Sequence, residues 1–147
     1  MNHDHANPAA PKYRTTVVYA CSGCSDAGEI ADRVARQLAR DGVARMSCLA
    51  GIGGRVRSLV ATAEKAERIL VVDGCPLNCA AHTLKLAGFQ KFDHLELHRI
   101  GLRKGSCPAT EDRIASGVAA AKEILADTAT PVSVEKMDQL QTAPATA

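Results

Sequence analysis

The stretch from Ile69 to Cys79 reads Ile-Leu-Val-Val-Asp-Gly-Cys-Pro-Leu-Asn-Cys and is the strongest indication of the fold. It is continuously apolar up to Asp73, which is typical of a central strand covered on both faces of a sheet. Pro76 is an allowed first-turn residue, so we expect a helix from Pro76 to about Gly88. Two cysteines would then lie where a strand ends and a helix begins.

The same order of features occurs earlier in the chain. A β-branched run at 15–20 is followed by Cys21-Ser22-Gly23-Cys24 and then by a helical pattern. Asp26 and Glu29 have the spacing of a capping box, so we expect Asp26 to cap a helix there. That helix would end at Asp41-Gly42 and bury a stripe formed by Ala27, Ile30, Ala31, Val34, Ala35 and Leu38.

The remaining segments continue the alternation of strands and helices. We expect a strand at 43–49, a glycine-rich turn at 50–54, a helix from 56 to about 66 and a strand at 93–99 with Glu96 facing outward. A last helix would bury Ile114, Val118, Ala121 and Leu125. This pattern predicts an α/β fold, a three-layer doubly wound arrangement with a mostly parallel four-stranded sheet in the order 2-1-3-4 and helices on both faces.

Composition limits the class of protein. The chain has 147 residues, a formal net charge of +2 and only 3% aromatic residues, which argues against a dedicated nucleic-acid binder. No apolar segment approaches the ~20 residues of a membrane span, and the first residues lack the order of a signal peptide. We therefore expect a cytoplasmic protein with reduced thiols and no membrane partner. Its expected organisation is a disordered leader at 1–14, a single cysteine-site domain at 15–127 and a flexible tail at 128–147.

Ligands of doubly wound folds bind beyond the carboxyl ends of the strands, where the two cysteine pairs are expected to converge. Closely spaced cysteine pairs that supply four sulfur donors are typical of zinc sites. We therefore predict that Zn²⁺ is bound by Cys21, Cys24, Cys75 and Cys79. Helix N-termini would favour the thiolate form of such cysteines. Possible additional site residues are Cys48, Asp73, His82 and Cys107.

Several alternatives remain open from the sequence. As alternatives to zinc, the thiols can hold an iron–sulfur cluster or Cu(I), or serve an enzyme that handles sulfur or disulfides. Cys48 and Cys107 are as readily explained as small core residues, and Asp73 as the cap of the following helix. Several basic side chains are expected at the same carboxyl edge of the sheet, where they can offset the negative charge of the thiolates or form a solvated surface: Arg55, Arg57, Arg99, Arg103 and Lys104. The partner is an unidentified small molecule or metal-exchange partner.

The glycine-rich segment at 51–54 is a weak candidate for a nucleotide site, because it follows the second strand and no Lys-Ser or Lys-Thr comes after it. We expect its glycines to let the backbone approach the thiol site closely or to bind a small anion at a helix start.

The stretch Val71-Val72-Asp73-Gly74-Cys75-Pro76-Leu77-Asn78-Cys79 resembles the central motif of the DGC family, named for its Asp-Gly-Cys tripeptide. The segments 21–24, 48–53 and 101–105 are similar to that family as well, so the resemblance covers roughly 15–126. The family is described as zinc-binding on the basis of four chelating cysteines. On this sequence the resemblance implies the ligands Cys21, Cys24, Cys75 and Cys79, and it implies no pathway.

Overall fold

The computed structural model describes residues 16–23 and 25–127. The expected leader at 1–14, the expected tail at 128–147 and Cys24 lie outside the described residues, so the predictions about them stay predictions. The elements in chain order are β1 (Thr16–Ala20), α1 (Asp26–Arg40), β2 (Arg45–Met46), α2 (Leu49–Gly53), α3 (Arg57–Glu64), β3 (Arg68–Asp73), α4 (Cys79–Leu86), β4 (Asp93–Glu96), the 3-10 helix η1 (Leu97–Ile100) and α5 (Glu111–Ala126).

The four strands form one sheet in the order β2-β1-β3-β4, and every pair is parallel. β1 lies beside β3 over its whole length, from Thr16 opposite Arg68 to Ala20 opposite Val72. Both central strands are almost entirely buried, as their continuous apolar runs predict. The predicted α/β fold and its strand order are therefore confirmed.

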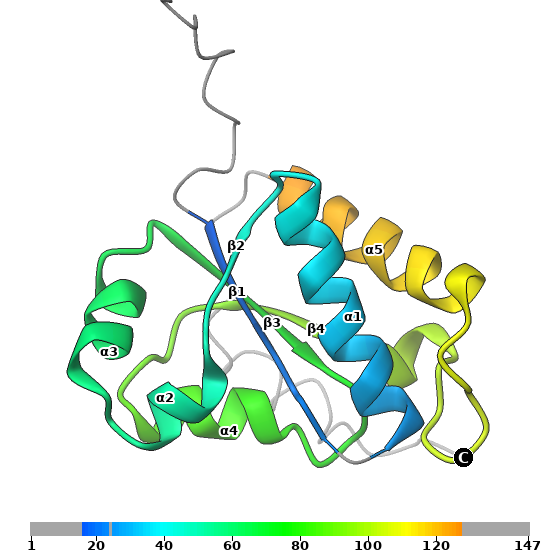
Figure 1. The fold of residues 1–147 in the computed structure, drawn as a ribbon, viewed down its shortest axis with the longest axis horizontal. Coiled ribbons are helices and arrows are strands. Elements are labelled where there is room, and N and C mark those ends of the chain that lie inside the picture. The colour runs from blue at the N-terminus through cyan, green and yellow to red at the C-terminus, as the bar shows by residue number, and fades with distance from the viewer. Residues whose placement is uncertain (1–15, 24, 128–147) are drawn as a thin grey trace, which may run out of the picture.

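Helices cover both faces of the sheet (Figure 1). α1 and α5 pack against each other over one face, and α2, α3 and α4 lie over the other, where α2 contacts α4. The connections that leave β1 and β3 thus go to opposite faces, so the ends of these two strands form the topological switch point of the sheet. The expected apolar stripes of α1 and α5 are buried in the core. Among the described residues, no helix has the length and apolar character needed to cross a membrane.

The starts of two helices differ from the expectation, each for a physical reason. Ser25 rather than Asp26 caps α1, because the Ser25 hydroxyl accepts the Gly28 N–H at 3.0 Å. α4 begins at Cys79 rather than Pro76, because the preceding residues form a turn closed by a hydrogen bond from Asn78 N to the Cys75 carbonyl at 3.1 Å.

The second and fourth strands are shorter than expected. β2 has only two residues before the chain enters α2, so the glycine-rich segment is helical rather than a turn. A Cβ on Gly51 would lie 2.0 Å from Leu59 Cδ1, so this glycine permits packing between α2 and α3 rather than an approach to the thiols. β4 ends at Glu96, and that side chain is buried at 6% exposure rather than outward.

Gly74 brings the loop after β3 directly against the first turn of α1. A Cβ at this position would lie 2.6 Å from the Ala27 carbonyl carbon and oxygen and 2.8 Å from Gly28 N. Backbone atoms cannot move aside as a flexible side chain can, so only glycine permits this approach. The contact holds the two cysteine-bearing loops at the same end of the sheet.

We predict that Gly74→Ala lowers the free energy of unfolding by about 1–3 kcal/mol, because the added methyl group overlaps the α1 backbone. Urea denaturation followed by circular dichroism measures this loss. Gly53→Ala is the matched control, since its Cβ would lie 3.6 Å from Thr83 Cγ2, an ordinary contact. Equal losses in the two variants would contradict the close approach.

Candidate functional site

A row of three side chains crosses the sheet at its carboxyl edge. Cys21 N donates to the Val72 carbonyl at 2.8 Å, which extends the ladder of β1 and β3 by one residue and places Cys21 beside Asp73. Asp73 is in turn paired with Glu96 of β4. Residues paired in a parallel sheet project to the same face. Cys21, Asp73 and Glu96 therefore face the side of the sheet that α4 covers.

Asp73 fastens the start of α4 to the sheet. Its carboxylate is 1% exposed and accepts the backbone N–H groups of Ala80 at 2.8 Å and Ala81 at 3.0 Å. His94 Nε2 lies 2.9 Å from the same carboxylate. These bonds satisfy two of the amides that a helix start leaves without an intrahelical partner. Of the two roles open from the sequence, the structure thus gives Asp73 that of anchoring the helix.

The loop from Cys75 to Cys79 holds its two thiols in different environments. Pro76 is the second residue of the turn, where its fixed φ is favourable, and Asn78 adopts a left-handed conformation with φ 48°. Cys79 then begins α4. Cys75 is buried and Cys79 is exposed, and both are free thiols.

Cys21 and Cys79 belong to different motifs, and Cys79 lies within electrostatic range of the Cys21 thiol. Burial raises the pKa of the Cys21 thiol, and the charges of Asp73 and Cys79 raise it further. Hydrogen bonds from the Gly23 and Gly74 backbone lower it in part. Without a metal, Cys21 is therefore held as the neutral thiol, which is the opposite of the thiolate expected from its position before a helix. The two motifs thus lie at the same end of the sheet, and the convergence of their four thiols stays a prediction.

The described part of the chain does not show the four cysteines gathered around one point. Within 16–23 and 25–127, no three histidine, cysteine, aspartate or glutamate side chains form a group that can hold a metal ion. Cys24 is outside those residues. The loop before it turns back over Cys21, because a Cβ on Gly23 would lie 3.2 Å from Cys21 Sγ. Cys21 and Cys79 thus form the described part of the site, and the four-ligand assignment stays a prediction.

The other candidate residues lie around this pair. Cys48 is exposed at the residue before α2, where Tyr19 is its neighbour. His82 is exposed on the second turn of α4, three residues after Cys79. Cys107 is buried in the loop after η1, where desolvation and the charge of Asp26 raise its pKa. All three lie beyond the carboxyl end of a strand, and no structural finding assigns them to the site.

Asp26 ties the loop after η1 to the start of α1. Its carboxylate accepts the N–H groups of Gly105 at 2.9 Å and Cys107 at 3.0 Å. These two hydrogen bonds are the main reason that the pKa of Asp26 is lowered from its usual 3.8. Figure 1 shows this yellow loop beside the first turn of α1. Asp26 therefore holds the loop of Gly105 and Cys107 against the start of α1 instead of capping that helix.

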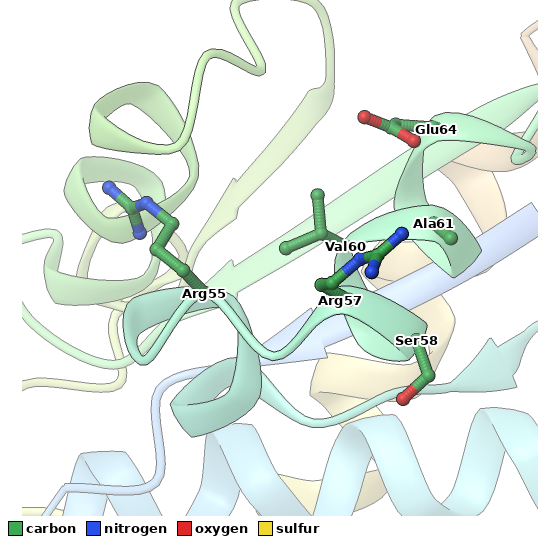
Figure 2. Close-up of a pocket in the computed structure, with 6 residues that line it drawn as sticks. All are labelled: Arg55, Arg57, Ser58, Val60, Ala61 and Glu64. Carbon is green, nitrogen blue, oxygen red and sulfur yellow. The ribbon is translucent and has the colours of Figure 1, made fainter.

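The basic residues of the rim do not converge on the thiols. Arg55 donates to the carbonyls of Ile52 and Leu86, both at 2.7 Å, and so clamps α2 to α4. Arg99 is paired with Glu96, and Arg103 and Lys104 are exposed on the loop held by Asp26. A groove of about 610 Å³ lies along α3 and the residues before it. Figure 2 shows the side chains that line it: Arg55, Arg57, Ser58, Val60, Ala61 and Glu64. No cysteine lines this groove, so it is separate from the thiol site.

Sequence reasoning missed two residues of the rim. Glu96 was expected to face outward, because strict alternation along the strand gives no sign of a buried carboxylate. Asn78 was treated as part of a helix, although Pro-x-Asn is a turn signal and asparagine tolerates the left-handed conformation. Asn78 Nδ2 donates to Glu96 Oε1 at 3.0 Å.

Comparison with known proteins places this geometry in a family. The DGC domain model matches residues 17–121. The Anaerobic and virulence modulator AnvM of Pseudomonas aeruginosa is 44% identical over 88 residues, which are 60% of this chain and 67% of that protein. No solved structure matches the chain.

We predict that Asp73→Asn lowers the free energy of unfolding by about 1–3 kcal/mol, because a buried charged acceptor of two helix amides is replaced by a neutral group. Hydrogen exchange should accelerate at Ala80 and Ala81 before it does at the strands. Asp32→Asn is the matched control: its ion pair with Arg36 lies on the surface of α1, where such pairs contribute about 0.3–0.5 kcal/mol. Unchanged exchange at the start of α4 would contradict the anchoring role.

We predict that Asp26→Asn removes a pH-dependent part of the stability. A carboxyl group whose pKa is lowered by folding stabilises the protein above its unfolded value, and this stabilisation is lost as the pH falls through the folded pKa. The difference in unfolding free energy between wild type and variant should be largest at neutral pH and should shrink below pH 3.8. Urea titrations over this range measure it. A difference that is constant with pH would contradict the assignment.

Proposed function

Because the chain belongs to the DGC domain family, we propose that the thiols at its carboxyl rim bind a metal ion through Cys21, Cys24, Cys75 and Cys79. Four sulfur donors favour zinc, which takes such ligands in a tetrahedral site. The first pair follows β1, and the second pair lies on the loop between β3 and α4. We propose a site that exchanges or senses metal rather than one that stabilises the fold, because the sheet and its helices already share a hydrophobic core.

The observation that supports the proposal is that Cys21 and Cys79, which belong to separate motifs, lie within electrostatic range of one another beyond the ends of the adjacent strands β1 and β3. Two thiols from separate motifs lie close enough for the charge of one to raise the pKa of the other. The nearby Asp73 adds negative charge to the same place. Such a site disfavours free thiolates and favours a cation that neutralises them. Metal binding would then convert Cys21 to its thiolate and release its proton.

The donor set fits zinc if two further sulfurs turn toward this pair. Cys75 lies on the same turn as Cys79, and Cys24 is the residue directly before the Ser25 cap of α1. Loops that carry ligands on a rigid scaffold can adjust by such side-chain rotations. Bound zinc would neutralise negative charge at this site, and the proposed ligands come from the segments that follow the adjacent strands β1 and β3.

The name of the Pseudomonas relative supports a regulatory role. That protein is called an anaerobic and virulence modulator. Thiolate ligands are lost when they are oxidised, so the metal content of a cysteine site responds to the oxidants around it. We therefore propose that this chain acts as a modulator whose thiol site changes state between anaerobic and oxidising conditions.

Metal analysis of protein purified without oxygen tests the proposal. We predict about one zinc ion per chain and no visible absorption, as a single four-sulfur site requires. Serine variants of Cys21, Cys24, Cys75 or Cys79 should lose this zinc, and Cys107→Ser, the matched control, should retain it. A brown protein that contains iron and sulfide would refute zinc in favour of a cluster, and bound copper would point to Cu(I).

A second function is suggested by the same pair of thiols. In a redox protein, Cys21 and Cys79 would form a disulfide by giving two electrons and two protons to a disulfide oxidant, which is reduced to two thiols. Exposed Cys79 at a helix start is the thiol that would attack first. Protein that holds no metal and oxidises reversibly between these two cysteines would favour this redox function over metal binding.

A further inference from the structure

Glu96 is a buried carboxylate that the thiol site does not use. Its side chain is 6% exposed at the end of β4, beside Asp73. It accepts a hydrogen bond from Asn78 Nδ2 at 3.0 Å and is paired with Arg99. Its other charged neighbours are the half-exposed Arg99 and His98, whose Nε2 lies 4.0 Å from Glu96 Oε1.

Asn78 holds an unusual backbone conformation. Its φ of 48° and ψ of 44° are left-handed, and it directly precedes the first residue of α4. Its side chain makes no capping hydrogen bond to the helix, although asparagine is a strong capping residue. The carboxamide instead reaches across to Glu96. Asn78 Oδ1 is buried without a hydrogen-bond partner in the described part of the chain, which is a cost that the Glu96 contact must offset.

This conformation sets the path of the cysteine loop. Asn78 N closes the turn on the Cys75 carbonyl, and the Asn78 carbonyl accepts the His82 N–H at 2.9 Å to open α4. Asn78 is therefore the joint between the turn that carries Cys75 and the helix that begins with Cys79.

We propose that Glu96 is a positioning residue that holds the Cys75–Cys79 loop through Asn78 and thereby keeps the two thiols in place. Asp73 holds the start of α4, which follows the loop, whereas Glu96 holds Asn78, which lies within the loop. This role deepens the proposed function, because it names the group that presets two of the four predicted ligands. It does not require the metal, since every contact that carries it is present in the protein alone.

Thiol labelling of the reduced, metal-free protein tests the proposal. N-ethylmaleimide modification is followed at each cysteine by mass spectrometry. Glu96→Ala should accelerate labelling of buried Cys75 about tenfold, the factor that corresponds to the loss of one hydrogen bond to a charged group. Cys107, which is buried under its own contact with Asp26, should keep its rate. Glu96→Gln retains an oxygen that can accept from Asn78 and should restore most of the protection.

Asn78→Ala provides an independent variant with the same expectation. If Glu96 acts through Asn78, the double variant should label at Cys75 no faster than the faster single variant. Additive effects, an unchanged Cys75 rate in both single variants, or equal acceleration at Cys75 and Cys107 would each overturn the proposal. Zinc retention by the wild type decides the metal-binding function separately, so failure of one conclusion is distinguishable from failure of the other.

Discussion

The hydrogen bonds from Asp73 to the first turn of α4 are the constraint on which the rim of this protein depends. A carboxylate at 1% exposure is stable only if it is well bonded, and here two helix amides and His94 surround it. Because Asp73 is the last residue of β3, these hydrogen bonds hold the first turn of α4 against the end of that strand. The chain between them has to reverse direction within a few residues, which places Cys75 and Cys79 at the switch point between β1 and β3.

Buried negative charge gives this rim its electrostatic character. Asp73 and Glu96 lie side by side on the two strands, and Asp73 contributes to the raised pKa of Cys21. Protons and cations are both favoured at such a place, so a thiol that is neutral in the metal-free protein can become a thiolate when a metal ion replaces its proton. Burial is the main reason that the pKa of Cys21 is raised, and the nearby charges of Asp73 and Cys79, which raise it further, would support metal binding.

The loops of the rim are held by contacts that do not involve the thiols. Asp26 bonds the segment around Gly105, Glu96 bonds Asn78, and Gly74 lies against the backbone of α1. Each contact joins segments distant in the chain. Thiols placed in this way lie on loops but have the support of a packed sheet, which is the arrangement found where loops carry function.

The sequence by itself determined the α/β class, the strand order and the placement of the two cysteine motifs at the same end of the sheet, because apolar runs, alternation with helices and right-handed crossovers are local or topological rules. Only the tertiary structure decided the partners of Asp26, Asn78 and Glu96. Their side chains follow no periodic pattern, and what they bond depends on elements that meet only when the sheet has formed. It also decided the state of Cys21, since the burial and charges that raise its pKa come from β3 and α4 rather than from its own motif.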